Sequence, residues 1–270
     1  MNEDRNNATA PSDDASPAEL SVDVVIPVLN EAHVLARSVA TVREFLAAKM
    51  PAYRWRVVIV DNGSKDGTDD VGRALAAKYS DVIFLHLDQR GRGRALRHAW
   101  MQSQANFVSY MDVDLSTNLT HLPEALHVLS RQRCDIAIGS RLMRASRTRR
   151  SFKRELISRL YNIFLKAVLW TRFSDAQCGF KVVTREVVEK IVPQIKDQSW
   201  FFDTELLVLA EKQGYRIHDI PVTWNEDDDS RVKIVSTAWE DIKGVFRLRR
   251  LLWTHEFAQA AVLHGKRAQS

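Results

Sequence analysis

The chain has 270 residues, of which 45% are hydrophobic and 27% charged, proportions that suit one sizeable globular core. They exclude bulk disorder, collagen-like repeats and coiled coil. Residues 1–20 carry five acidic residues and one basic residue, which leaves 38 basic and 29 acidic residues, a net charge of +9, on the remainder. A basic body of this kind favours anionic partners: nucleic acid, an anionic membrane surface or phosphorylated small molecules.

The first twenty residues predict a disordered acidic tail, because they contain almost no large apolar side chains. They also lack a basic stretch followed by an apolar one, and the longer apolar stretches of the chain are interrupted by charge. We therefore expect neither a signal peptide nor a transmembrane helix. Cys134 and Cys178 are too few for a disulfide framework, which favours free thiols in a reducing compartment.

From Val22 onward, short β-branched runs alternate with helical patterns. The runs are almost continuously apolar, as strands covered on both faces are, and they lie at 22–28, 55–60, 82–87, 106–111 and 134–138. The helical patterns lie between them, at 31–48, 67–79, 92–104 and 121–132. This alternation predicts an α/β domain with a doubly wound, mostly parallel sheet, in which ligands bind at the carboxyl ends of the strands.

Polar motifs stand at these strand ends: P-V-L-N-E at 27–31, D-N-G-S at 61–64, D-V-D at 112–114 and G-S-R at 139–141. Asp112 and Asp114 offer the hard oxygen ligands that suit Mg²⁺ or Mn²⁺, although a solvated turn would use the same residues. Asp61 can accept hydrogen bonds from a base or ribose, or can simply belong to a turn. Residues 90–97, R-G-R-G-R-A-L-R, place basic side chains at a helix start, where an anion is favoured.

Three later blocks complete the pattern: D-A-Q-C-G-F-K at 175–181, W-F-F-D-T-E-L-L at 200–207, and P-V-T-W-N-E at 221–226 followed by Ser230 and Arg231. The whole set resembles the nucleotide-sugar glycosyltransferases of the GT-A fold. It is most similar to the polyprenyl-phosphate sugar transferases, in particular the dolichyl-phosphate β-glucosyltransferase branch, over about residues 21–250. Arg94 and Asp229 stand where this branch usually has Gly, and Arg231 stands where it has Lys. These departures affect the expected loop conformations more than the expected reaction.

The resemblance implies a role for each matching residue. The nucleotide sugar would be held by Pro27, Leu29, Glu31, Asp61, Ser64, Arg92, Arg97 and Asp112. The metal, Mg²⁺ or Mn²⁺, would be bound by Asp112 and Asp114. The acceptor phosphate would be gathered by Arg141, Lys181, Ser230 and Arg231. The catalytic group would contain Arg141 and Asp175. Asp175 would act as the base or would organise the acceptor, and Asp203 and Glu205 are alternative candidates for that role. Asp175 could also be only a loop acid or a helix cap.

Elementary chemistry supports this division of roles. Sugar transfer pushes negative charge onto the departing diphosphate, so preorganised cations there are the main means of acceleration. A lipid phosphate is already an anion at pH 7, because its second pKa is about 6. No strong base is therefore required.

A basic stretch and an amphipathic helix follow the strand-end motifs. Residues 144–154 contain six basic residues and no acidic one, and residues 155–170 predict a helix too short and too charged to span a bilayer. Its polar stripe would consist of Arg159, Asn162 and Lys166. Its apolar arc, expected to lie in a membrane interface or alternatively in the core, would consist of Ile157, Leu160, Phe164 and Val168. A second such helix is predicted at 236–253, which could also simply cover the sheet.

Our leading hypothesis is a metal-dependent inverting glycosyltransferase that moves a hexose, glucose before others, from a UDP-sugar to a polyprenyl phosphate. We expect a tail at 1–20, a GT-A domain at 21–235 that includes an interfacial helix at 152–170, and a C-terminal amphipathic helix and tail at 236–270. We expect a peripheral or monotopic protein on the cytoplasmic face of a membrane, without a nucleic-acid partner; a membrane-protein partner is left open. The alternatives are a soluble GT-A transferase acting on a saccharide or protein, and a non-enzymatic protein that binds nucleotides or nucleic acid.

Overall fold

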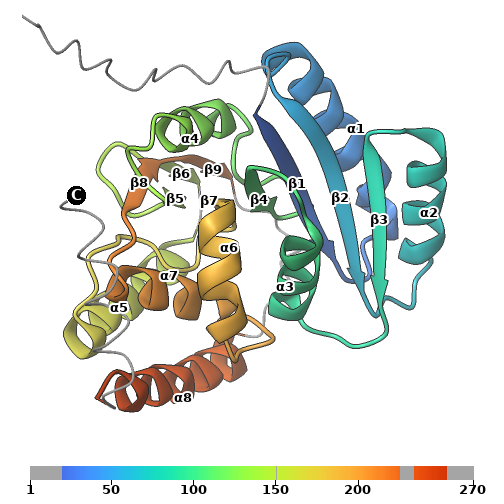
Figure 1. Cartoon of the computed structure of the whole chain (residues 1–270). Helices are drawn as coiled ribbons and strands as arrows, with labels where there is room; N and C mark the ends of the chain where they lie inside the picture. The colour runs from blue at the N-terminus through green and yellow to red at the C-terminus, as the bar shows by residue number, and fades with distance from the viewer. Residues whose placement is uncertain (1–19, 150, 226–233, 254–270) are drawn as a thin grey trace, which may run out of the picture.

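A computed structural model describes residues 20–149, 151–225 and 234–253. Its centre is a seven-stranded sheet in the order β3-β2-β1-β4-β7-β5-β8 (Figure 1). The strands are β1 (Ser21–Val28), β2 (Arg54–Asn62), β3 (Val82–Leu87), β4 (Phe107–Met111), β5 (Ile136–Ser140), β7 (Phe180–Thr184) and β8 (Ile217–Pro221). All neighbours pair in parallel except β7, which is antiparallel to both β4 and β5.

Helices connect these strands and cover both faces of the sheet. They are α1 (Ala32–Lys49), α2 (Thr68–Lys78), α3 (Arg92–Gln102), α4 (His121–Ser130), α5 (Phe152–Leu169), α6 (Arg185–Ile191), the 3₁₀-helix η2 (Val192–Gln194), α7 (Phe202–Lys212) and α8 (Ile234–Trp253). A small parallel pair joins β6 (Arg147–Arg149) to β9 (Thr223–Asn225). The predicted mostly parallel α/β sheet is confirmed, and its five predicted strands and four predicted helices lie within two residues of their observed bounds.

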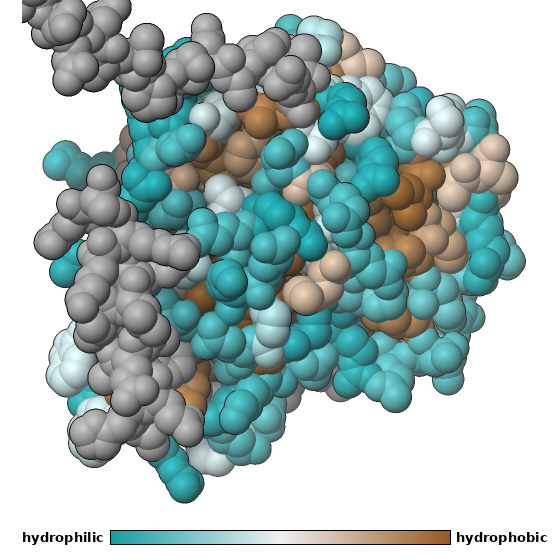
Figure 2. All heavy atoms as spheres, viewed as in Figure 1, coloured by the Kyte–Doolittle hydropathy of each residue, from teal (hydrophilic) through white to brown (hydrophobic). Residues whose placement is uncertain are grey.

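The core consists of two layers, one on each side of the sheet. Neighbouring residues of β1 point to opposite layers: Val25 packs in the layer of α3, α5, α6, α7 and α8, whereas Val24 and Ile26 pack in the layer of α1, α2 and α4. This double burial explains the almost continuously apolar strand sequences. Edge strand β3 is less covered, and Figure 2 shows hydrophobic residues gathered over it, where Ile83 and Leu85 are only partly buried.

Helices α5 and α8 pack against each other at one end of the molecule (Figure 1). The two predicted amphipathic helices are thus observed, and neither they nor the other helices of the described residues are long and apolar enough to cross a membrane. The predicted tail lies outside the described residues except for Leu20, as do residues 254–270.

The exposed face of α5 differs from the predicted one. Phe164 and Val168 pack against the core, and Asn162 is buried, where its side chain donates to the Ser158 carbonyl and accepts from the Ala176 amide. Leu160 is exposed as predicted, but in a row with Phe152, Leu156 and Ile163 that is followed by exposed Trp170. The helix therefore uses one apolar face for the core and a second for the surface, which a single predicted arc did not anticipate.

Candidate active site

The first wall of the candidate site is built from the loops after β1 and β2. Backbone N–H groups of Asn30 and Glu31 donate to the Ser64 and Thr68 hydroxyls, both at 2.8 Å, and the Lys65 N–H donates to the Asn30 side chain at 2.8 Å. These bonds fix the two loops to each other. The predicted base-binding residues Pro27, Leu29 and Glu31 are half-buried along this wall, beside predicted residues Asp61 and Ser64.

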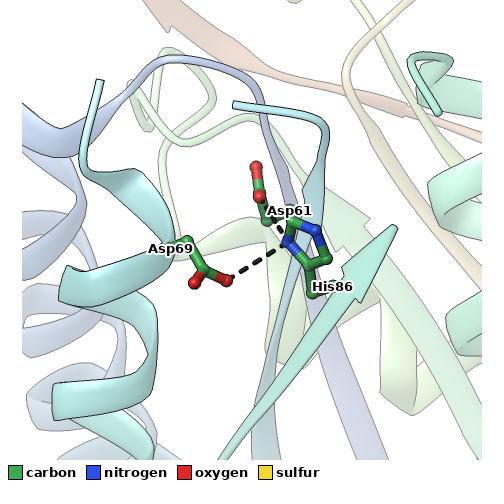
Figure 3. A group of neighbouring side chains, drawn as sticks. All are labelled: Asp61, Asp69 and His86. Atoms are coloured by element: carbon green, nitrogen blue, oxygen red, sulfur yellow. Dashed lines mark hydrogen bonds and ion pairs between the residues drawn. The ribbon is translucent and has the colours of Figure 1, made fainter. Parts of the chain in front are cut away.

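Asp61 lies completely buried at the floor of this wall. One carboxylate oxygen accepts from the Ser64 hydroxyl at 2.5 Å and its N–H at 3.2 Å, and the other lies 2.9 Å from His86 Nδ1. Asp69 Oδ1 lies 3.2 Å from the same nitrogen (Figure 3). Sequence reasoning missed His86, although a histidine within the apolar run V-I-F-L-H-L was a signal. The three side chains are close enough to share a cation, with ligand atoms within 4.8 Å of one another.

A second wall forms around Arg92, at the start of α3. Its guanidinium donates to Asp203 at 2.6 Å and to Asp112 at 3.0 Å, and it stacks on the rings of Tyr110 and Trp200 with centroid distances of 4.7 and 5.1 Å. Burial opposes the charge of Arg92, but the surrounding Tyr110, Asp112 and Asp203 outweigh it and raise its pKa well above its usual value. Arg92 is therefore a fixed cation that joins the D-V-D motif to α7.

Asp112 and Asp114 are the reachable carboxylates of this wall. The Asp112 side chain is 40% exposed, and Asp114 is exposed and accepts from the Ser116 N–H at 2.9 Å. Asp112 rests directly on Gly179, since a Cβ added to that glycine would lie 1.7 Å from Asp112 Oδ2. Two hard carboxylates open to solvent are a donor set that fits Mg²⁺ or Mn²⁺.

Behind Arg92 lies a buried group formed by Asp203, Lys181 and Tyr110. The Tyr110 hydroxyl donates to Asp203 at 2.6 Å, and Lys181 Nζ lies 3.2 Å from Asp203 and 2.8 Å from the Cys178 carbonyl. Burial raises the pKa of Asp203, but Lys181 and Arg92 outweigh it and hold that pKa below its usual value. Lys181 is 0% exposed, so its predicted contact with an acceptor phosphate is corrected: it neutralises Asp203 instead.

Asp175 and Arg141 form a separate ion pair at the end of β5. The guanidinium contacts the carboxylate through two bonds of 2.8 and 3.0 Å, and the Arg141 N–H adds a third at 3.1 Å. Asp175 is completely buried, which raises its pKa, but Arg141 outweighs burial and the pKa lies below its usual value. An acid held in this way is a weak proton acceptor. Arg141 also faces the ring of Trp224, 5.6 Å from its centroid.

Two predicted site residues point away from this group. Arg97 donates to the Ile195 carbonyl, and burial lowers its pKa. Glu205 faces α8, where it accepts from Arg247 at 2.5 Å and from the Asp197 N–H at 2.9 Å. These contacts do not support their predicted places at the diphosphate and at the reacting sugar, which stay predictions. Predicted residues Ser230 and Arg231 lie outside the described residues.

The start of α3 also differs from expectation. The N–H groups of Gly93 and Arg94 donate to the carbonyls of Ser199 and Gln198, at 3.1 and 3.0 Å. These N–H groups are thus already bonded to backbone carbonyls of the protein. The Arg92 side chain faces Asp112, and the backbone of this turn does not. The two glycines of the motif permit this packing, because a Cβ on Gly91 would lie 2.3 Å from the Gln198 carbonyl oxygen and one on Gly93 2.6 Å from Phe202.

The doubly wound sheet, the acidic pair and the paired arginines at its strand ends define a glycosyltransferase of the GT-A type. The chain belongs to glycosyl transferase family 2, whose family model matches residues 23–192. The similarity to this class of enzyme that the sequence motifs indicated is thereby confirmed. The non-enzymatic alternative is excluded by the same finding.

Curated relatives extend the comparison. Glycosyltransferase AglD of Haloferax volcanii is 35% identical over 82% of this chain, which spans only 36% of that relative. Dolichyl-phosphate β-glucosyltransferase ALG5C of Trichomonas vaginalis is 29% identical over 88% of this chain and 75% of its own length. The human dolichyl-phosphate β-glucosyltransferase is 31% identical over 83% of this chain and 73% of its own.

Solved structures confirm the fold. Glucosyl-3-phosphoglycerate synthase of Mycobacterium tuberculosis, in complex with Mn²⁺, uridine diphosphate and phosphoglyceric acid, superimposes with a TM-score of 0.65 and 15% identity, covering 86% of this chain and 79% of that one. A second structure of that enzyme, with Mg²⁺ and uridine diphosphate, gives a TM-score of 0.64 at 16% identity, covering 86% of this chain and 80% of that one.

Proposed function

We propose that this glycosyltransferase moves glucose from UDP-glucose to a polyprenyl phosphate, with inversion at the anomeric carbon. The relatives named dolichyl-phosphate β-glucosyltransferase support the sugar and the acceptor. The observation that carries the proposal is the arrangement at the strand ends: two reachable carboxylates, Asp112 and Asp114, beside an arginine that is already fixed by Asp203.

The donor would lie across the two walls. The uridine would lie along Pro27, Leu29 and Glu31, with its base near Ser64, whose hydroxyl donates to the buried Asp61. The diphosphate would then face Asp112, Asp114 and Arg92. A divalent cation, Mg²⁺ or Mn²⁺, held by Asp112 and Asp114 would supply positive charge to the leaving diphosphate when bound. The described acidic group at His86 is less suited to this task, because Asp61 is completely buried there.

The transfer itself needs few protein groups. An oxygen of the acceptor phosphate attacks the anomeric carbon of glucose from the face opposite UDP, the bond from that carbon to the β-phosphate oxygen breaks, and UDP departs with the bonding electrons. Arg92 faces the charge that develops on UDP. The acceptor is already anionic, and both Asp175 and Asp203 are ion-paired with lowered pKa values. These acids therefore position cations rather than accept a proton.

The acceptor phosphate would approach Arg141, with Ser230 and Arg231 as further candidates. The Arg141 side chain is mostly buried but still 13% exposed, and its guanidinium lies 5.6 Å from the Trp224 ring centroid. Strand β9, which contains Trp224, pairs with β6, so the basic residues Arg147 and Arg149 stand next to this approach. A phosphate arriving from this side meets cations before it meets the sugar.

We propose further that the enzyme acts at the surface of a membrane through residues 144–170 and 236–253. On α8 the exposed Trp239, Phe246 and Trp253 alternate with exposed Lys243 and Arg250 along one stripe. The exposed apolar row of α5 lies on the neighbouring helix. Apolar side chains interleaved with basic ones are typical of helices that lie in an anionic membrane interface.

The cytoplasmic face of that membrane is the side we favour. Cys134 and Cys178 are both buried free thiols, and burial raises the pKa of each to about 11. Such thiols are compatible with a reducing compartment.

A donor and acceptor screen tests the proposed function. Purified protein is given UDP-glucose, other UDP-hexoses or GDP-mannose, with Mg²⁺ or Mn²⁺, and either a polyprenyl phosphate in vesicles or a soluble saccharide or protein acceptor. We expect the fastest transfer from UDP-glucose to the lipid phosphate. Faster turnover of GDP-mannose would contradict the assigned donor, and transfer only to soluble acceptors would favour a soluble GT-A enzyme.

A further inference from the structure

One face of α8 is attached to the loop that contains Asp175. Asp241, on this inner face, is 3% exposed and accepts a hydrogen bond of 2.6 Å from the side chain of Gln177. The Gln177 N–H in turn donates to Asp175 at 3.3 Å. A short path of hydrogen bonds therefore runs from α8 through Gln177 to the Asp175–Arg141 ion pair.

The same helix also contacts α7, which contains Asp203. Gly244 of α8 lies against the Phe201 ring so closely that a Cβ on it would be 2.5 Å from the ring carbons. Arg247, one turn further on, pairs with Glu205 at 2.5 Å. Helix α8 thus contacts the segments of both buried acids of the site, Asp175 and Asp203.

The outer face of α8 is the stripe proposed to meet the bilayer. Its members Trp239, Lys243, Phe246, Arg250 and Trp253 follow one another at spacings of four and three residues, so they lie on one side of the helix. The inner and outer faces of one rigid element therefore contact the active site and the proposed membrane.

We propose that α8 transmits membrane attachment to the active site, and that Asp241 is the positioning residue that does so by holding Gln177 and, through it, the Asp175 loop. This inference rests on the proposed membrane-surface function. Asp241 acts through Gln177 and does not touch the substrates. One of its oxygens, Oδ1, is buried without a hydrogen-bond partner among the described residues, so Gln177 is the group that fixes its orientation.

The test uses a short, water-soluble isoprenyl phosphate as acceptor, which removes any effect of concentrating a lipid acceptor on a surface. Empty vesicles of phosphatidylglycerol and phosphatidylcholine are added to the full chain with UDP-glucose. We expect turnover of the wild type to rise about fivefold or more, the lower end of usual couplings between sites. Asp241→Ala should bind the vesicles but show no rise, whereas Asp241→Asn, which keeps an acceptor oxygen, should retain it. Asp70→Asn, which removes an exposed acid from α2, is the control.

A second readout separates this inference from the proposed function. Hydrogen exchange of residues 175–181 should slow when vesicles bind the wild type and should not change in Asp241→Ala or in Gln177→Ala, which interrupts the same path. If vesicles leave both turnover and exchange of the wild type unchanged, or if Asp241→Ala responds as the wild type does, the coupling is wrong. If no variant transfers sugar but the exchange difference is present, the proposed function fails and the coupling stands.

Discussion

Asp112 takes its position from two neighbours on opposite sides, Arg92 and Gly179. Arg92 attracts one of its oxygens, and the absence of a side chain on Gly179 leaves room for the other. The glycine does not have a positive φ, so an alanine fits its backbone and only the side-chain space is at issue. The D-V-D motif is therefore positioned by a residue 67 places further along the chain.

Loss of a carboxylate charge in this motif should abolish most transfer. We expect Asp112→Asn and Asp114→Asn each to lower kcat by about 100-fold or more with an unchanged melting temperature, because the metal loses an anionic ligand and the leaving diphosphate its counter-charge. Initial rates across a Mn²⁺ titration measure this. Asp70→Asn, an exposed acid on α2, is the control. Full activity of both variants in the presence of a chelator would rule out the metal assignment.

A methyl group on Gly179 should act through Asp112. We expect Gly179→Ala to weaken Mn²⁺ affinity by about 10-fold or more, the usual effect of disturbing a group that orients a metal ligand, because the new Cβ would overlap the carboxylate. Calorimetric titration of Mn²⁺ with UDP measures the affinity. In an Asp112→Ala background the same substitution should have no further effect. An equal loss in both backgrounds would show that the methyl group acts elsewhere.

At the scale of elements, the orientation of α7 could not be predicted from the sequence. Asp203 and Glu205 are two residues apart on this helix, so the motif made both of them candidates. Residues two apart on a helix do not face the same side, and the structure turns Asp203 toward Arg92 and Glu205 toward α8. Which of the two faced the site depended on how α7 docks, and that information is not local.

Strand β7 was missed for a related reason. Its sequence, F-K-V-V-T, is short and contains Lys181, which reads as a solvent-facing residue. The lysine is buried because Asp203, from a distant helix, and the Cys178 carbonyl compensate its charge. By contrast, β1 to β5 could be predicted because burial on both faces leaves a direct record in the sequence. Compensation of a buried charge by a residue far away in the chain leaves no such pattern in the local sequence.

The buried Asp241 makes α8 sensitive to pH. Burial, together with the charges of Asp197 and Asp203, raises its pKa from 3.8 to about 6 despite the hydrogen bond from Gln177. The folded chain therefore binds this proton more tightly than the unfolded chain. The charged form of Asp241 therefore lowers the free energy of unfolding. This loss of stability is absent below about pH 3.8, grows as pH rises and is complete above about pH 6.

Asp241→Asn should accordingly stabilise the protein at neutral pH. The gain in unfolding free energy should approach about 3 kcal/mol at pH 7.5, from 1.36 kcal/mol for each pKa unit, and should vanish near pH 4. Urea unfolding at both pH values measures it, with Asp70→Asn on α2 as the exposed control. An equal difference at the two pH values would mean that the charge of Asp241 is not the cause.

At the scale of the whole molecule, basic residues follow one another on the side where we propose that the acceptor enters. The strand-end arginines Arg92 and Arg141 are each paired with buried acids. The exposed basic residues of β6 and the start of α5 follow directly after Arg141 in the chain. This order divides the molecule into a face proposed to hold the sugar nucleotide and a face proposed to attract anionic lipid, joined at the β6–β9 pair.

Removing exposed charge from the second face should release the protein from membranes without affecting the first. We expect the triple variant Arg147→Gln, Arg149→Gln and Lys153→Gln to lose about 3 kcal/mol of affinity for anionic vesicles, at about 1 kcal/mol for each charge near the surface. The exposed apolar row of α5 would then be too weakly held at moderate salt. Vesicle sedimentation between 50 and 300 mM salt, roughly the range over which screening becomes strong, measures this loss.

Nucleotide binding should be preserved in the same variant, because its three residues lie outside the two walls that contain Ser64, Arg92 and Asp112. Transfer to lipid in a bilayer should fall in parallel with vesicle binding, while calorimetric binding of UDP with Mn²⁺ stays at the wild-type value. A control variant that neutralises Arg54, Arg131 and Arg133, exposed residues near the amino ends of β2 and β5, removes the same charge from the opposite end of the sheet and should still sediment with vesicles. Release of both variants alike would show that net charge alone governs attachment. Loss of nucleotide binding with intact vesicle binding would place the basic residues in the donor site instead.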